Sequence, residues 1–324
     1  MMKEPAKITA IDHLNASALM LVTPEYAELK RKRSVAGYNP AAPSFAEPPP
    51  MPSEFTTIQG VKTRFAHHSN EGRPTVVLLN PLPQSILAFA PMWASLCEKF
   101  EVYAYDLPGF GRSAGGVEFM NFKAQGEFLG AFISHFSIEG AHLVGPDIGM
   151  PTVLYHAATD GAGVRSVFVG DGPAISPSSN GSIINKMGYS SFWRLIMGSV
   201  GSGPFVEAGN RVGYVNYVPN ATEISEYKES YAGRMPAILE WFKGYPESLA
   251  SLDPLIGNIQ HPTLLFWGRD DKLLLVDNGE RLLQRIPGSR LHVFDHCGHF
   301  SYQDQYEEFR DLLVNWVEEV EGKA

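Results

Sequence analysis

Eight short apolar segments between Phe55 and Phe294 constrain the fold of this 324-residue chain more than any other feature of its sequence. Several are continuous apolar runs, which is typical of strands covered on both faces of a parallel sheet. Helical stretches lie between them, for example at 92–99 and 122–136. We therefore predict an α/β fold, with a mostly parallel eight-stranded sheet and helices on both faces. The expected strands are 55–58, 62–67, 75–79, 102–105, 141–144, 166–169, 263–267 and 291–294.

The alternation of strands and helices divides the chain into three parts. Residues 1–53 precede it and include five prolines between positions 43 and 52, which predicts an N-terminal arm ending in an extended Pro-rich tether. The arm is expected to pack over, or hang from, the following domain. Strand-like segments then disappear from 173–257, a stretch too long for a simple loop, so we predict an inserted helical cap there. Residues 54–172 and 258–324 form the predicted core.

Composition and charge exclude several classes of protein. The net charge of −9, from 26 basic and 35 acidic side chains, argues against a nucleic-acid partner. The two cysteines, Cys97 and Cys297, have no CxxC spacing, so we expect no disulfide framework, no metal and no cofactor. No apolar run is long enough for a membrane span or a secretory signal, which favours a cytoplasmic protein with no membrane partner. Nothing in the sequence indicates an oligomeric state.

The predicted strand ends carry a candidate catalytic set. In an open parallel sheet, reactive side chains gather at the carboxyl ends of the strands. Gly145-Pro146-Asp147-Ile148-Gly149 follows one strand, and a small-x-nucleophile-x-small turn holds its central side chain at the top of the sheet. Asp147 occupies this central position, and Asp271 and His299 follow in the order nucleophile, acid, histidine. Two structural alternatives remain: Asp147 as a turn residue bonding its own backbone, and His299 as a hydrogen-bonded core histidine.

Four motifs at these strand ends resemble a known family. They are "DLPGFGRS" at 106–113, "VGPDIG" at 144–149, "WGRDD" at 267–271 and "GHF" at 298–300. Together they are similar to the α/β-hydrolase superfamily, and specifically to its branch with an aspartate nucleophile. That branch contains epoxide hydrolases, haloalkane dehalogenases and fluoroacetate dehalogenases. The resemblance covers residues 55–324 and implies an α/β-hydrolase fold, with the insertion as the cap domain.

The same resemblance implies a triad of Asp147, Asp271 and His299. The family's Gly-x-x-Asp spacing selects Asp271 over Asp270, while Asp171 is an alternative acid because some dehalogenases supply it after the preceding strand. His296 is predicted to be structural. A dinucleotide-like Gly-x-Gly-x-x-Ala pattern at 109–114 lies in mid-chain with no acid ending the next strand, so no nucleotide cofactor is expected.

An aspartate at the turn suits displacement at a saturated carbon. A carboxylate is normally ionised at neutral pH and can attack such a carbon directly, whereas attack on an ester carbonyl would give a mixed anhydride. The resulting alkyl-enzyme ester requires water activated by His299, which Asp271 would hold. The expected oxyanion-hole donors are the backbone N–H groups of Ile148 and Leu82. Leu82 is chosen because the family's His-Gly-X-Pro loop here reads Asn80-Pro81-Leu82-Pro83, and proline has no N–H.

The sequence leaves two leaving groups open, an epoxide oxygen and a halide. Ile148 stands where haloalkane dehalogenases usually carry tryptophan, and "DIGMP" lacks the arginines of fluoroacetate dehalogenases. Epoxide hydrolases use two cap tyrosines, and the expected positions hold Trp193 and Phe242, with Tyr189 and Tyr245 close by. Trp193 could instead donate its indole N–H to a halide.

The sequence therefore predicts a hydrolase acting on a small apolar organic substrate and water. An epoxide hydrolase is the first choice and a haloalkane or haloacid dehalogenase the second. A non-catalytic small-molecule receptor on the same fold is the third interpretation, motivated by Pro81 and Pro146 beside the catalytic turn.

Overall fold

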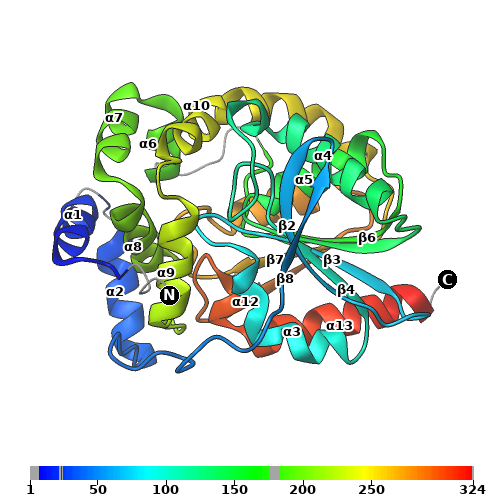
Figure 1. The fold of residues 1–324 in the computed structure, drawn as a ribbon, viewed down its shortest axis with the longest axis horizontal. Helices are drawn as coiled ribbons and strands as arrows, with labels where there is room; N and C mark the ends of the chain where they lie inside the picture. Colours follow the sequence, from blue (N-terminus) through cyan, green and yellow to red (C-terminus); the bar gives the residue numbers. More distant parts are fainter. Residues whose placement is uncertain (1–6, 22, 24, 176–182, 323–324) are drawn as a thin grey trace.

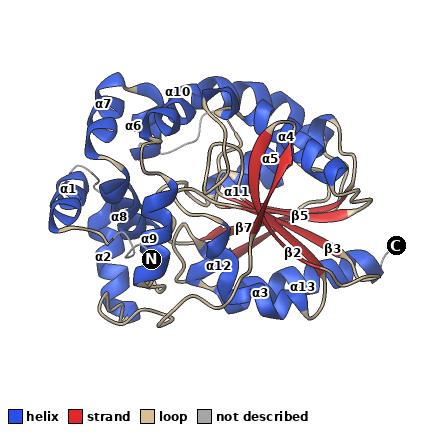
Figure 2. Cartoon of the chain, in the orientation of Figure 1, coloured by secondary structure: helices blue, strands red, loops and turns tan. Residues whose placement is uncertain are grey.

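An eight-stranded sheet with helices on both faces forms the body of the protein in a computed structural model (Figures 1 and 2). The structure describes residues 7–21, 23, 25–175 and 183–322. Parts of the predicted arm and one segment of the predicted cap, residues 176–182, lie outside the described residues. The strand order is β1-β2-β4-β3-β5-β6-β7-β8.

All eight predicted strands are present, with ends that differ by a few residues. The β1–β2 and β2–β4 pairs are antiparallel and every other pair is parallel, so the predicted α/β-hydrolase sheet is confirmed. The strands are β1 (Glu54–Ile58), β2 (Val61–His68), β3 (Thr75–Leu79), β4 (Glu101–Tyr105), β5 (Ala141–Pro146), β6 (Val164–Gly170), β7 (Thr263–Gly268) and β8 (Arg290–Phe294).

The continuous apolar runs arise because helices cover both faces of the sheet. Successive strand residues point to opposite faces, so Val76 and Leu78 pack in one core and Val77 and Leu79 in the other. One face is covered by α3 and α13, and the other by α4 and α5 (Figure 1). The core helices are η1 (Ile86–Phe89), α3 (Ala90–Cys97), η2 (Val117–Phe119), α4 (Phe122–His135), α5 (Gly149–Thr159), α11 (Asp277–Leu283), α12 (Ser301–Asp304) and α13 (Tyr306–Gly322).

Helices replace strands between β6 and β7, in the region predicted to be the cap. They gather at one end of the sheet in Figure 1, and α10 extends from there toward α4. None of the described helices of the chain has the length and apolar character needed to cross a membrane. The helices of this insertion are α6 (Ile183–Tyr189), α7 (Ser191–Val200), α8 (Ser202–Gly213), α9 (Ala221–Ser230), α10 (Met235–Leu252) and η3 (Asp253–Asn258).

The N-terminal arm contains two helices, α1 (Ala10–Leu21) and α2 (Glu25–Ala36), which both contact α8 of the cap. Residues 37–53 form neither helix nor strand, as their prolines predict. This tether lies on the cap, because the backbone N–H of Ser44 donates to the Val218 carbonyl oxygen at 2.9 Å. The described part of the arm therefore packs over the neighbouring domain through α1, α2 and the tether.

Candidate active site

Asp147 lies on the tight turn between β5 and α5. Its backbone φ of +49° falls in the left-handed region, which few residues other than glycine adopt and which aspartate tolerates better than most. The strand and the helix approach each other closely at this turn, and glycine at position 145 permits the approach. A Cβ atom there would lie 2.5 Å from the carbonyl oxygen of Gly149. The Asp147 side chain that this turn presents is 10% exposed.

The turn brings Asp147 together with His299 and Asp271. His299 Nε2 is 3.5 Å from Asp147 Oδ1, and His299 Nδ1 is 2.8 Å from Asp271 Oδ2. The other oxygen of Asp271 accepts the backbone N–H groups of Leu273 at 2.8 Å and Leu274 at 2.9 Å. Those two hydrogen bonds fix the Asp271 carboxylate, which in turn orients the imidazole toward Asp147.

Two carboxylates control the charge of His299. Burial by itself lowers the pKa of the imidazole, but the negative charge and hydrogen bonds of Asp271 and Asp147 outweigh it and hold the pKa well above its usual value. The imidazolium is therefore favoured while both carboxylates are ionised.

The other candidate residues do not contact the imidazole. Asp171 Oδ1 accepts the Gly268 N–H at 2.9 Å, and its Oδ2 accepts the Ser301 hydroxyl. Burial, followed by the nearby charge of Asp271, raises the pKa of Asp171 well above its usual value. Asp270 pairs with Lys32 at 2.7 Å, and the His296 side chain is exposed. The geometry therefore favours Asp271 as the partner of the histidine.

One backbone N–H contacts the Asp147 carboxylate among the described residues. Leu82 N donates to Asp147 Oδ2 at 2.6 Å, at the position where the sequence predicts an oxyanion-hole donor. Ile148, the other predicted donor, is the residue before the first turn of α5 and borders the same cavity. No hydrogen bond from Ile148 to the carboxylate is present in this state.

Buried polar side chains hold the loop that carries Leu82. The Tyr231 hydroxyl of the cap donates to the Gln84 carbonyl oxygen at 2.6 Å, and Gln84 Nε2 donates to Gln303 Oε1 at 2.8 Å. The Tyr302 hydroxyl donates to Gln84 Oε1. The loop is thus attached both to the core and to the cap.

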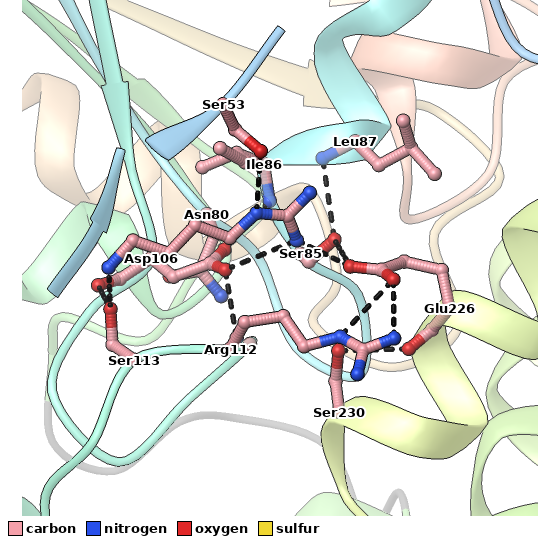
Figure 3. A network of polar contacts seen from close by, with 12 residues as sticks. Ser53, Asn80, Ser85, Ile86, Leu87, Asp106, Arg112, Ser113, Glu226 and Ser230 are labelled. Carbon is pink, nitrogen blue, oxygen red and sulfur yellow. Dashed lines mark hydrogen bonds and ion pairs between the residues drawn. The ribbon is translucent and has the colours of Figure 1, made fainter. Parts of the chain in front are cut away.

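A charged network continues this attachment beyond Ser85 (Figure 3). Glu226 on α9 accepts hydrogen bonds from Arg112 at 2.6 Å and from Arg64, and both arginines belong to the core. Asp106 accepts the backbone N–H of Ile86 at 2.8 Å, next to the Leu82 loop. Burial raises the pKa of Asp106 to about 6, although the charge of Arg64 acts in the opposite direction. The network joins the cap to the strand ends beside the site.

An apolar cavity opens above Asp147. The space within its walls is about 790 Å³, a figure that includes the part continuous with solvent. Asp147 and His299 are the only titratable groups other than a tyrosine among its described lining residues. The lining residues are Leu19, Met20, Thr23, Leu82, Pro83, Asp147, Ile148, Pro173, Ile184, Met187, Met197, Phe205, Ala208, Gly209, Val212, Trp241, Phe242, Tyr245, Leu273, Leu274, His299 and Phe300.

The cap residues proposed from the sequence separate into two groups. Tyr245 and Phe242 line the cavity, whereas Tyr189 is 61% exposed on the cap surface. Trp193 is outside the described lining; its ring makes an edge-to-face contact with Phe192, and the Lys186 ammonium lies over it, 5.5 Å from the ring centroid. Tyr189 is the last residue of α6 and Trp193 lies on α7, and neither is among the described residues that line the cavity, so the geometry favours Tyr245 over both for a leaving-group role.

Trp241 also lines the cavity, although the sequence analysis did not identify it as a candidate site residue. It is 2% exposed and lies on α10 with its neighbours Ile238, Phe242 and Tyr245, at the spacing of one helix face. That spacing is visible in the sequence, but it also describes ordinary packing residues. Only the orientation of α10 over the sheet shows that this face borders the cavity.

The comparison with protein families agrees with this geometry. The sequence profile described as "Alpha/beta hydrolase family" matches residues 76–312, well over half of the chain. The chain belongs to the alpha/beta hydrolase family. As a member of that family it is a hydrolase, which agrees with the prediction made from the strand-end motifs.

Individual relatives of this alpha/beta hydrolase have names that indicate different activities. A 2-hydroxy-6-oxononadienedioate/2-hydroxy-6-oxononatrienedioate hydrolase of Cupriavidus pinatubonensis is 24% identical over 82% of this chain and 95% of that protein. A loop variant of the haloalkane dehalogenase DbeA from Bradyrhizobium elkanii has a TM-score of 0.71 at 16% identity, covering 84% of this chain and 98% of that one. The ligand-free epoxide hydrolase CorEH has a TM-score of 0.69 at 19% identity, covering 82% and 98%. These structural matches establish the fold alone.

The tight turn predicts the effect of one added methyl group. Gly145→Ala should lower the free energy of unfolding by about 1–3 kcal/mol, because its Cβ would meet backbone atoms that cannot move independently. Gly140→Ala is the matched control, since its Cβ would have only one neighbour, the Arg165 Cβ at 4.0 Å. Urea unfolding measures both changes. Equal stability of the two variants would contradict the close strand–helix contact described here.

Proposed function

We propose that this protein hydrolyses a small apolar epoxide in two steps, through an ester formed on Asp147. The observation that carries the proposal is the unequal environment of the two Asp147 oxygens. Oδ2 accepts the Leu82 N–H, while Oδ1 is the oxygen near His299 Nε2. Oδ2 thus occupies the position of a carbonyl oxygen in an oxyanion hole, which leaves Oδ1 for attack on carbon.

The first step needs no base. Oδ1 attacks a ring carbon of the epoxide, an O–C bond forms, and the ring C–O bond breaks. The released alkoxide takes a proton from a donor in the cap. Tyr245 is the phenol among the described lining residues, and it comes from α10 of the cap, which supports the epoxide over the halide.

The second step follows from the charge lost in the first. Esterification neutralises Asp147, which removes one of the two carboxylates that raise the pKa of His299. The imidazolium then releases its proton more readily, to the phenolate that the first step leaves on Tyr245, and the neutral imidazole can accept a proton from water. The hydroxide attacks the Asp147 Cγ, and the Leu82 N–H stabilises the charge that develops on Oδ2. Collapse breaks the ester C–O bond, the imidazolium gives its proton to the departing alkoxide to form the diol, and the acid left on Asp147 gives its proton back to His299, which restores the carboxylate.

A dehalogenase is the second candidate, supported by Trp241. Its indole borders the cavity, and an indole N–H can stabilise a departing halide. In that reaction Oδ1 forms the same ester while the carbon–halogen bond breaks, and water attacks that ester in the second step.

The activity in the name of the Cupriavidus relative fits this cavity less well. A dienedioate carries two carboxylates, and no lysine or arginine is present among the described lining residues. Placing two negative charges beside Asp147 in an apolar cavity would be costly. We therefore do not extend that substrate to this chain.

Trapping the ester tests the proposed function. His299→Gln should still be alkylated when mixed with a panel of epoxides and haloalkanes, but the adduct should persist and turnover should fall by about 10²-fold or more. Intact-protein mass spectrometry distinguishes the substrates, because an epoxide adds its whole mass and a haloalkane adds its mass less one hydrogen halide. Peptide mapping should place the adduct on Asp147.

The matched control is the double variant Asp147→Asn/His299→Gln, which should form no adduct. Unchanged turnover in His299→Gln, or an adduct on another residue, would refute the two-step scheme. A wild-type protein that binds panel members without converting any of them would favour the receptor interpretation.

Two conservative substitutions separate the leaving groups. Tyr245→Phe removes only a hydroxyl, so it should slow alkylation by an epoxide by about 10²-fold or more if the phenol supplies the proton. Trp241→Phe should leave epoxide opening within a few fold and slow halide release instead. Rapid-quench measurement of adduct formation gives both rates. Loss of haloalkane reactivity in Trp241→Phe, with no effect of Tyr245→Phe on epoxides, would reverse the assignment.

A further inference from the structure

The N-terminal arm contributes three residues to the wall of the cavity. Leu19 and Met20 near the end of α1, together with Thr23, line it and are between 4% and 8% exposed. They belong to the part of the chain that precedes the family match, which begins at residue 76. The substrate space of this hydrolase therefore has a wall made by a segment outside the matched fold.

The arm is attached to the cap by buried and charged contacts. Arg33 is 7% exposed, and its guanidinium donates to the carbonyl oxygens of Tyr214 at 2.6 Å and Asn210 at 2.7 Å. At the other end of the arm, Lys228 pairs with Asp12 at 2.7 Å. Breaking the Arg33 contacts would leave a buried charge without hydrogen-bond partners, which is strongly unfavourable.

The same arm is attached to the loop that holds the proposed acid. Lys32 pairs with Asp270 at 2.7 Å, and Glu28 pairs with Lys272 at 3.0 Å. The core members of these two pairs, Asp270 and Lys272, are the residues immediately before and after Asp271 in the sequence. The arm is consequently fixed against both the cap and the core, and its cavity wall is in place in the folded protein.

We propose that Leu19 and Met20 determine the size of the substrate that this hydrolase accepts, with the arm acting as a fixed wall of the cavity that Asp147 borders. This inference rests on the proposed function for the reaction, but its physical content is the shape of the cavity. A small change of volume in an apolar site changes discrimination between substrates by about 10-fold or more per methylene.

The test measures substrate preference in variants that change the wall in opposite directions. Leu19→Ala and Met20→Ala should raise kcat/KM for a bulky epoxide relative to a small one by about 10-fold, while Leu19→Phe should lower that ratio. Leu21→Ala is the matched control, because Leu21 lies on the same helix and is 88% exposed. Its ratio should equal that of the wild type.

A second measurement does not depend on catalysis. Calorimetric titration with n-alkanols from butanol to octanol reports the cavity directly, and the preferred chain length should increase in Leu19→Ala and Met20→Ala and decrease in Leu19→Phe. Preferences that match the Leu21→Ala control in both measurements would overturn the inference. If no epoxide or haloalkane is converted but the alkanol preference shifts, the proposed function fails and the assignment of the wall stands. If Leu19→Ala does not fold, Leu19→Phe and Met20→Ala still decide the outcome.

Discussion

A carboxylate at the floor of an apolar cavity is unfavourable unless other groups compensate its charge, and Asp147 places this requirement on its surroundings. The Leu82 N–H and the His299 imidazole meet it directly, and Asp271 supports the histidine. Each of these groups follows a different strand of the parallel sheet. The order of the strands thus brings residues that are far apart in sequence to one carboxylate, which pairs its charge and places it for the nucleophilic role proposed above.

The pairing also links the two proposed half-reactions. Asp271 and Asp147 together raise the pKa of His299, and Asp147 contributes only while it is free, so ester formation weakens the attraction that keeps the imidazole protonated. The same residue would therefore serve as a counter-ion before alkylation and as a base afterwards. A serine at this position would not provide this change, because its hydroxyl carries no charge in the free enzyme.

Local sequence patterns predict the core well because each part of it follows from short-range physics. Continuous apolar runs such as Thr75–Leu79 indicate strands buried on both faces, and the flanking glycines of Asp147 indicate a close turn. The strand-end rule then predicts where the side chains of Asp271 and His299 come together. The cap and the arm are harder to predict from sequence, because the side of an amphipathic helix that faces the cavity depends on which elements pack against that helix. Tyr189 and Tyr245 look equivalent in the sequence, yet only Tyr245 lines the cavity.

Oxygen-isotope labelling tests the central claim, that Asp147 supplies the oxygen transferred to substrate. A single turnover with enzyme in excess is run in H₂¹⁸O, using an epoxide or haloalkane that the protein converts. The account predicts a product whose new hydroxyl carries ¹⁶O, and ¹⁸O in the peptide containing Asp147, because water attacks the ester carbonyl carbon and not the substrate. A first-turnover product that carries ¹⁸O, with an unlabelled Asp147, would mean direct attack by water and would contradict the account.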